Sequence, residues 1–406
     1  MDDKPRNLKE MLSEAKDTSE LMVDLGYAAL FFSDERMADE VRELETRLTG
    51  LTHEMRAVCV LAGRSKRDAD QIASVLHVVS AIERLANAAV DISRVVTHRL
   101  GIPAGLVGDL ANAEEVSHRV RVRPGSRLAG RTLEAAELPT DTGMRVVALR
   151  RGRDWVVDPD GDELALAEDV LILRGPPEGI GEVRELAGAP EWRPAAPTDA
   201  PALSDLDRAV DVLVEMKNVS EAAVGLAYSA LLLADQGLAA EVSQLEDRLD
   251  EMCEQLELWV LRAGAETVDP SGLRGLLHLG NASEEVGDAA QQLVWLVEAE
   301  EEMHPVLAAA LGDTDEVFVQ FPVAAASALD GEEITSGRVG DDTGFHLLAI
   351  RRDGSYFYRP RRIRLAAGDE ILATGPWEGR AELARQCGYR LIADDDTGTV
   401  ELLPAE

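Results

Sequence analysis

The sequence of 406 residues contains few cysteines, few lysines and few aromatic residues. Its three cysteines, Cys59, Cys253 and Cys387, are an odd number without CxxC spacing, which excludes a disulfide framework and a zinc knuckle. Only five of the 41 basic residues are lysines, against 76 acidic residues, and the net charge is −35. Because this charge repels nucleic acids and anionic membrane surfaces, we expect no nucleic-acid partner.

The charge pattern also bears on the habitat of the protein. Abundant Asp and Glu beside scarce Lys is typical of proteins adapted to high intracellular salt, because screening makes a dense surface charge tolerable there. A salt-accumulating microbe is therefore the expected source. The alternative is an acidic protein from an organism with a GC-rich genome.

Long hydrophobic runs are absent as well. The most apolar run, residues 222–234, has 13 residues, whereas a membrane-spanning helix needs about 20. The N-terminal segment "MDDKPRNLKE" carries too many charges for a signal peptide. We expect a cytoplasmic protein that reaches a membrane only peripherally, through a transporter.

Motifs of common enzyme classes are missing too. The chain has no GxGxxG, no P-loop and no Gly-x-Ser-x-Gly elbow, and residues 178–183 have only two of the dinucleotide-binding glycines. NAD is therefore not expected as a cofactor, and the expected function is not catalytic.

The sequence is internally duplicated. At an offset of 201 residues, 17 of the 35 positions from Glu14 to Leu48 are identical, and the register holds through Asp-Thr-Gly at 141–143 and 342–344. The phrase "DVLILRGPPEGI" at 169–180 returns as "DEILATGPWEGR" at 369–380. A chain of two similar units, each of about 200 residues, follows from this repeat.

In each unit the spacing of apolar residues changes once along the sequence, from a helical period to the alternation of strands. Apolar residues at spacings of three and four predict helices over 8–62, with a break near Ser33 and Asp34, and over 69–100, which together form an antiparallel three-helix bundle. Alternating stretches such as "HRVRVRPGS" and "MRVVALRR" then predict strands, and "PPEGIGEVRELAG" a closing helix. The second part of each unit is thus a small α+β module.

The α+β module resembles the TrkA C-terminal domain, also called the RCK C-terminal domain. The resemblance is carried by Leu-x-Gly-x-x-Leu at a helix start, by Thr-Gly before a strand that ends in Arg-Arg, and by the closing strand with Gly-Pro. In the second unit the loop "DPDGDE" is replaced by the basic "YRPRRIR". The resemblance implies regulation of potassium channels or transporters, and a small ligand such as cyclic di-AMP at a dimer interface.

The helical part resembles PhoU, a family of phosphate-transport regulators. The segments "AIERLANAAVDIS" and "ASEEVGDAAQQLV" are similar to a PhoU segment in which Glu and Asp, one helical turn apart, help to bind metal. Glu284 and Asp288 match that spacing, and Glu83 is the first-unit counterpart of Glu284, but Asn87 stands where the Asp is expected. The resemblance implies a divalent metal ion on the bundle.

Together the resemblances point to an archaeal tandem protein of the α+β multidomain class, in which PhoU-like helical half-bundles alternate with TrkA C-terminal domains. The expected boundaries are 1–112 and 206–313 for the half-bundles, 113–187 and 314–406 for the TrkA C-terminal domains, and 188–205 for a Pro/Ala-rich linker.

Each candidate site has a structural alternative. The carboxylate pair Glu284 and Asp288 can also arise on a solvated helix face of so acidic a chain, and the recurring Glu45 and Glu246 are interpreted as surface charge. The recurring His77 and His278 are expected to be satisfied helix histidines rather than ligands.

Two adjacent arginines end the same strand in both units. Arg150, Arg151, Arg351 and Arg352 are candidates for binding a small anionic ligand, because guanidinium groups suit phosphate. Structural ion pairs with neighbouring acids are the equally weighted alternative.

Four functions are compatible with the sequence, and one of them is a purely structural adaptor that binds a transporter and no small ligand. The leading hypothesis is a ligand-responsive, non-catalytic regulatory subunit of cation transport, most plausibly of potassium, that binds a membrane transporter or channel and forms a homo-oligomer, expected to be a dimer. The second is a regulator of divalent-cation or phosphate transport with metal on the bundle. The third is a metal-dependent phosphoesterase.

Overall fold

The structure is a computed structural model. It describes residues 6–62, 65–103, 106–110, 113, 115–152, 154–191, 204–266, 270–312, 316–334, 338–340, 343–352, 355–358, 363–393 and 400–404.

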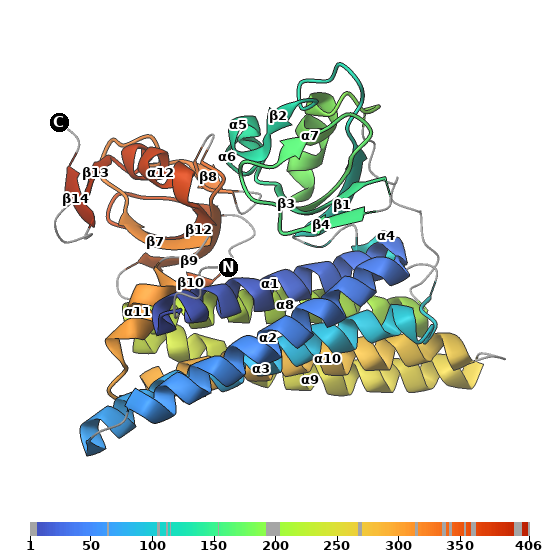
Figure 1. The fold of residues 1–406 in the computed structure, drawn as a ribbon, viewed down its shortest axis with the longest axis horizontal. Helices are drawn as coiled ribbons and strands as arrows, with labels where there is room; N and C mark the ends of the chain where they lie inside the picture. Colours follow the sequence, from blue (N-terminus) through green and yellow to red (C-terminus); the bar gives the residue numbers. More distant parts are fainter. Residues whose placement is uncertain are drawn as a thin grey trace.

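Six long helices form an elongated body (Figure 1). The first unit contributes α1 (Leu8–Phe32), α2 (Glu35–Ala62) and α3 (Lys66–Thr97), and the second contributes α8 (Asp205–Leu233), α9 (Gln236–Glu266) and α10 (Arg274–Glu298). The predicted three-helix bundle of each unit is thus confirmed.

The predicted break between the first two helices is present in both units. Ser33 and its counterpart Ala234 adopt the left-handed conformation, each with φ of 49°. The next residue, Asp34 or Asp235, then accepts hydrogen bonds from backbone N–H groups that open the following helix. The turn between the first two helices is therefore built in the same way in both units, from a left-handed residue followed by a capping aspartate.

The two bundles share one hydrophobic core, which extends over all six helices. Across it, Nζ of Lys16 lies 5.4 Å from the ring centre of Tyr228, and Nζ of Lys217 lies 5.2 Å from that of Tyr27. Because each unit supplies the ring that covers the other unit's lysine, the bundles are related by an approximate twofold axis.

Helix α3 meets a length and hydropathy criterion for a membrane span over Asp68–Thr97. However, 61% of an apolar 18-residue window of this helix is buried inside the protein, where α3 packs against α1, α2 and α10. This is the position of a core helix in a helical bundle.

Each α+β module is built around a four-stranded antiparallel sheet. In the first module the strand order is β1 (Val116–Arg121), β6 (Val170–Gly175), β3 (Arg145–Arg151) and β4 (Asp154–Val157). The second module repeats this order with β7 (Glu316–Pro322), β12 (Glu370–Pro376), β9 (His346–Arg352) and β10 (Ser355–Tyr358). The sequence repeat is therefore a repeat of the fold.

Shorter elements complete the modules. The first has β2 (Arg131–Thr132), α5 (Leu133–Ala136), α6 (Leu138–Thr142), β5 (Leu164–Ala165) and the closing helix α7 (Ile180–Leu186). The second has β8 (Glu333–Ile334), β11 (Ile363–Arg364) and α12 (Arg380–Gln386), followed by a hairpin of β13 (Tyr389–Ala393) and β14 (Val400–Pro404). Helices α4 (Leu106–Leu110) and α11 (Pro305–Leu311) connect the body to the modules.

Close packing explains the glycine that follows Glu in both copies of the repeated phrase. A Cβ atom on Gly179 or Gly379 would collide with the carbonyl oxygen of Thr142 or Thr343, in the Thr-Gly turn before the neighbouring strand. Both glycines have negative φ, near −73°, so they are required for space and not for an unusual backbone conformation.

Both modules rest side by side on one long face of the body, above α1 and α8 (Figure 1). They also contact each other. Nη2 of Arg338 donates to the carbonyl of Asp141 at 3.2 Å, and the Cα of Gly344 packs so closely against the carbonyl of Pro139 that a side chain there would clash. The Thr-Gly turns of the two units thus form the contact between the modules.

Candidate functional site

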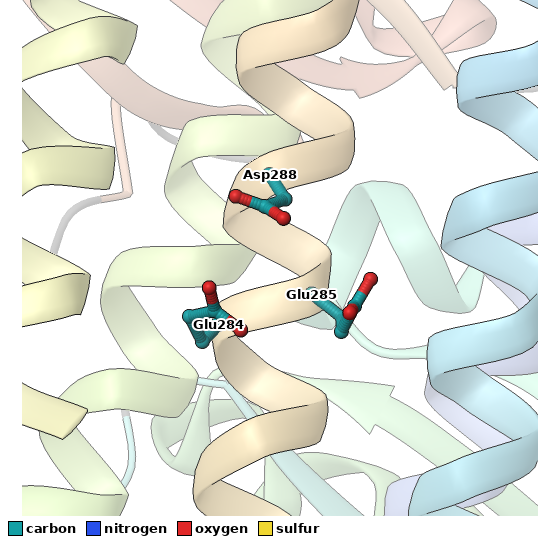
Figure 2. A group of neighbouring side chains, drawn as sticks. All are labelled: Glu284, Glu285 and Asp288. Carbon is teal, nitrogen blue, oxygen red and sulfur yellow. The ribbon is translucent and has the colours of Figure 1, made fainter.

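The predicted carboxylate pair lies on α10 as part of a larger acidic cluster. Oxygens of Glu284, Glu285 and Asp288 all lie within 4.8 Å of one another, on adjacent turns of the helix (Figure 2). Arg84 of α3 reaches this cluster from the other unit. Its Nε is 3.0 Å from Glu285, and its Nη2 is bonded to Asp288. Part of the negative charge is therefore already balanced.

Glu246 of α9 adds a buried carboxyl group beside this cluster. It is only 8% exposed, so interpreting it as surface charge was wrong. Burial, together with the negative charges of Asp250 and Asp288, raises the pKa of Glu246 to about 7. Burial also raises the pKa of Glu284 and of Asp288. A site with such raised acid pKa values gains from a bound cation.

In the first unit the carboxylate equivalent to Glu284 is that of Glu83, and it is paired with an arginine of the same unit. Arg56 donates two hydrogen bonds to the Glu83 carboxylate, at 2.7 and 2.5 Å, and Thr52 donates a third at 2.5 Å. The second unit has Glu257 at the position of Arg56. A pocket of about 220 Å³ adjoins Glu83 and is also lined by Glu45 and Asn87. Metal binding by Glu83 stays a prediction, and its carboxylate is already paired with a guanidinium group.

The two recurring histidines differ. Nε2 of His77 lies 2.6 Å from the carbonyl oxygen of Gln292, and its ring stacks on Trp295 with centres 5.0 Å apart. Nε2 of His278 is buried without a hydrogen-bond partner among the residues that the structure describes. The expectation of a satisfied helix histidine therefore holds for His77 alone.

The paired arginines end strands β3 and β9, as predicted, and the second of each pair is held by a buried aspartate. Arg151 binds Asp169 through Nη2 at 2.8 Å, and Arg352 binds Asp369 through Nη2 at 2.6 Å. Each aspartate also accepts a backbone N–H from the loop before it, that of Leu166 or Ala366. These contacts match the structural alternative, because they fasten the arginine strand to the start of the closing strand.

The first arginine of each pair has a different environment. Arg351 is bonded to Glu370 at 2.5 Å, whereas the guanidinium carbon of Arg150 lies 5.8 Å from the ring centre of Trp155. An anionic ligand at these arginines stays a prediction. Most of the basic loop of the second unit, residues 359–362, lies outside the described residues.

Sequence reasoning missed a cluster of charged groups around a buried arginine. Arg174, near the end of β6, has a side chain only 9% exposed and contacts three carboxylates: Asp24 of α1 at 2.8 Å, Glu115 at 2.8 Å and Glu221 of α8 at 3.0 Å. Lys217 completes the cluster, donating to Glu221 at 2.7 Å and to the Glu115 carbonyl at 3.1 Å. These five residues, here called the Arg174 cluster, join the first module to both bundles.

The acids of the Arg174 cluster are not equivalent. Burial raises the pKa of Asp24 to about 7, and the opposing effects of Arg174 and Arg145 do not offset it. Burial also acts to raise the pKa of Glu115, but the positive charges of Arg174, His346 and Lys217 lower it more, to about 2. The cluster is therefore held by charge–charge contacts in a poorly solvated place, where each partner depends on the others.

No such cluster is present among the described residues of the second module. Thr374 stands at the position of Arg174, and Gly225 at that of Asp24, although Lys16 and Glu20 match Lys217 and Glu221. The two modules are consequently attached to the body by different chemistry. The repeat itself was a signal for this difference, because charged residues of one unit align with Thr and Gly of the other.

Comparisons with known proteins agree with this architecture. A model of the PhoU domain matches residues 12–96 and 213–295, and a model of the TrkA-C domain matches residues 118–188 and 318–388. These matches confirm the predicted alternation of domains. The exact domain boundaries and the archaeal source stay predictions.

Similar proteins extend the comparison. Ktr system potassium uptake protein C of Bacillus subtilis (strain 168) is 32% identical over 85 residues, which are 21% of this chain and 38% of that protein. The chain therefore matches less than half the length of this curated relative.

Solved structures show weaker likenesses. The structure of PhoU from Pseudomonas aeruginosa is 16% identical with a TM-score of 0.39, covering 71% of this chain and 93% of that chain. The GsuK channel bound to NAD is 16% identical with a TM-score of 0.19, covering 78% and 65%. The family assignment rests instead on the matched domain models. The chain belongs to the PhoU and TrkA-C domain families, and each of its two repeats contains one domain of each kind.

Proposed function

We propose that this chain is a non-catalytic regulatory protein of potassium transport that responds to a small ligand through its pair of TrkA-C domains. The observation that carries the proposal is the direct contact between the two TrkA-C domains, on a body that both repeats build together. Similarity to a protein named for potassium uptake supports the choice of ion.

The route of the signal follows from this arrangement. A ligand that binds one relative orientation of the two TrkA-C domains more tightly shifts the protein toward that orientation. The first TrkA-C domain is coupled to α1 and α8 through the Arg174 cluster. Since the helices share one core, a change in the domains reaches the helical body, which binds a membrane transporter or channel from the cytoplasmic side.

Ligand binding and transport test this proposal together. Calorimetry of the full chain at high salt, with cyclic di-AMP, nucleotides and divalent ions, is expected to find a binder. Rubidium uptake by cells that carry or lack the protein is expected to differ, and Arg338→Ala, which removes a contact between the domains, should alter the response to the ligand. If no ligand of the panel binds and rubidium uptake is unchanged, the proposal is refuted.

A second candidate function is regulation by a divalent metal ion on α10, for which the acidic cluster around Glu284 is the specific observation. Mn²⁺ should raise the melting temperature of the full chain, because a ligand that binds only the folded state stabilises it. Glu284→Gln and Asp288→Asn should remove this shift. The matched change in the first unit, Glu83→Gln, should leave it intact, since Arg56 already neutralises Glu83.

The pH dependence of this metal binding has a defined direction. Because burial raises the pKa of Glu246 to about 7, protons compete with the metal below that pH, and the Mn²⁺-induced shift should grow as pH rises through about 7. An equal shift in the wild type and in Glu284→Gln would exclude this site. Turnover of phosphoesters with Mn²⁺ that is lost in Glu284→Gln would instead favour the phosphoesterase alternative.

A further inference from the structure

The ends of the two long helical hairpins expose aliphatic side chains. At the end of α2, Val60 is 76% exposed and Leu61 is 79% exposed, and at the end of α9, Leu261 is 69% exposed. These are the three most exposed large hydrophobic side chains among the described residues. Val58 and Leu258 extend the two surfaces. We call these ends the first tip (58–62) and the second tip (257–262).

The tips occupy equivalent positions in the two repeats. Val60 aligns with Leu261 in the sequence repeat, so the approximate twofold axis relates the two surfaces. They lie at opposite ends of the long axis of the body (Figure 1). A single chain therefore cannot bring its own tips together, and any contact between them is a contact between two chains.

The tips have diverged in charge. At aligned positions of the repeat, His53 of the first unit corresponds to Glu254 of the second, and Lys66 corresponds to Thr267. The sequence near the first tip contains Arg64, Lys66 and Arg67 beside Glu54, Asp68 and Asp70, whereas that near the second contains Glu251, Glu254, Glu257, Glu266 and Asp269 beside Arg262. Lys66, Glu251, Glu254 and Glu257 are exposed. The sequence around the second tip is strongly acidic, whereas the sequence around the first tip has nearly balanced charge in a chain of charge −35.

We propose that the first tip of one chain docks on the second tip of another copy of this chain. The aliphatic side chains of both tips leave water in this contact, and Lys66, beside the first tip, faces the acidic side chains beside the second. Two second tips repel each other, and two first tips bring like basic groups together. The contact is head to tail, so it leaves one tip free at each end and continues into a series of chains.

Two single substitutions test the polarity of this contact. Leu61→Glu disables the first tip and leaves the second intact, and Leu261→Glu does the reverse. Both side chains are exposed, so both variants should fold. In sedimentation velocity, the wild type should form species larger than a dimer as its concentration rises. Each variant alone should stay monomeric, with an association constant lowered roughly tenfold or more. An equimolar mixture of the two should form dimers that grow no further.

Charge and surface controls complete the experiment. Lys66→Glu should weaken association of the full chain, and adding Glu254→Lys should restore it. Leu164→Glu, at a leucine of the first TrkA-C domain that is 42% exposed, should have no effect. A wild type that is monomeric at every concentration overturns the proposal. So does Leu261→Glu that dimerises by itself, or binding of the first tip to phospholipid vesicles without self-association.

Discussion

Replacing Arg174 with methionine is expected to lower the free energy of unfolding by about 3–5 kcal/mol, because removing one partner of a buried ion pair leaves the other charges uncompensated. Asp24 and Glu221, whose side chains are each 15% exposed, would keep only Arg145 and Lys217, respectively, as neighbouring cations, and Glu115 would lose its contact with Arg174. Methionine retains most of the apolar volume of the arginine stem. The loss therefore reports on charge and not on packing.

Urea denaturation of the full chain measures this effect. The control is Arg121→Met, which removes an arginine paired with Glu168 on the surface, where side chains are 55% and 58% exposed. Such exposed pairs contribute about 0–1 kcal/mol. Because the chain has several domains and need not unfold in one step, hydrogen exchange along β6 and α8 should locate the loss. Equal stability of the two variants would contradict the role assigned to the Arg174 cluster.

Alanine at Gly379 is expected to destabilise the second TrkA-C domain by about 1–3 kcal/mol or more, the usual cost of forcing extra atoms into a packed interior. The new methyl group would collide with the backbone carbonyl of Thr343, which cannot rotate away as a side chain would. Gly179→Ala should act in the same way on the first domain, against the carbonyl of Thr142.

Gly181→Ala is the matched control for these changes. It lies on the closing helix α7, where an added Cβ has no neighbour within 4 Å. There the higher helix propensity of alanine should stabilise the domain by up to about 1 kcal/mol. Thermal denaturation should thus separate Gly179→Ala from a change made two residues away. If both lowered stability alike, the close contact of Gly179 would not be its cause.

Much of the architecture was predictable because it depends on local periodicity and on the repeat. The break at Ser33 and Asp34, the three-helix bundles and the strand pattern follow from residue spacing within short windows. Because the two units align in sequence, each helix or strand predicted in one unit is also predicted at the aligned position of the other. The Asp that opens each closing strand was visible in the repeated phrase, although its ion pair with Arg151 or Arg352 was not.

The Arg174 cluster was not predictable in this way. Its members come from α1, from the start of β1, from β6 and from α8, and no sequence window contains more than two of them. The same holds for Arg84, a first-unit residue that balances carboxylates of the second unit. Contacts between distant segments are set by how the domains pack, and spacing along one chain carries no record of that.

The lysine and tyrosine pairs in the middle of the body decide whether half of this molecule can exist alone. Lys16 and Lys217 are 1% and 4% exposed, and the aromatic ring over each belongs to the other repeat. A separated half would expose to solvent the apolar helix faces that the two bundles bury against each other. Neither repeat is therefore expected to fold stably without the other.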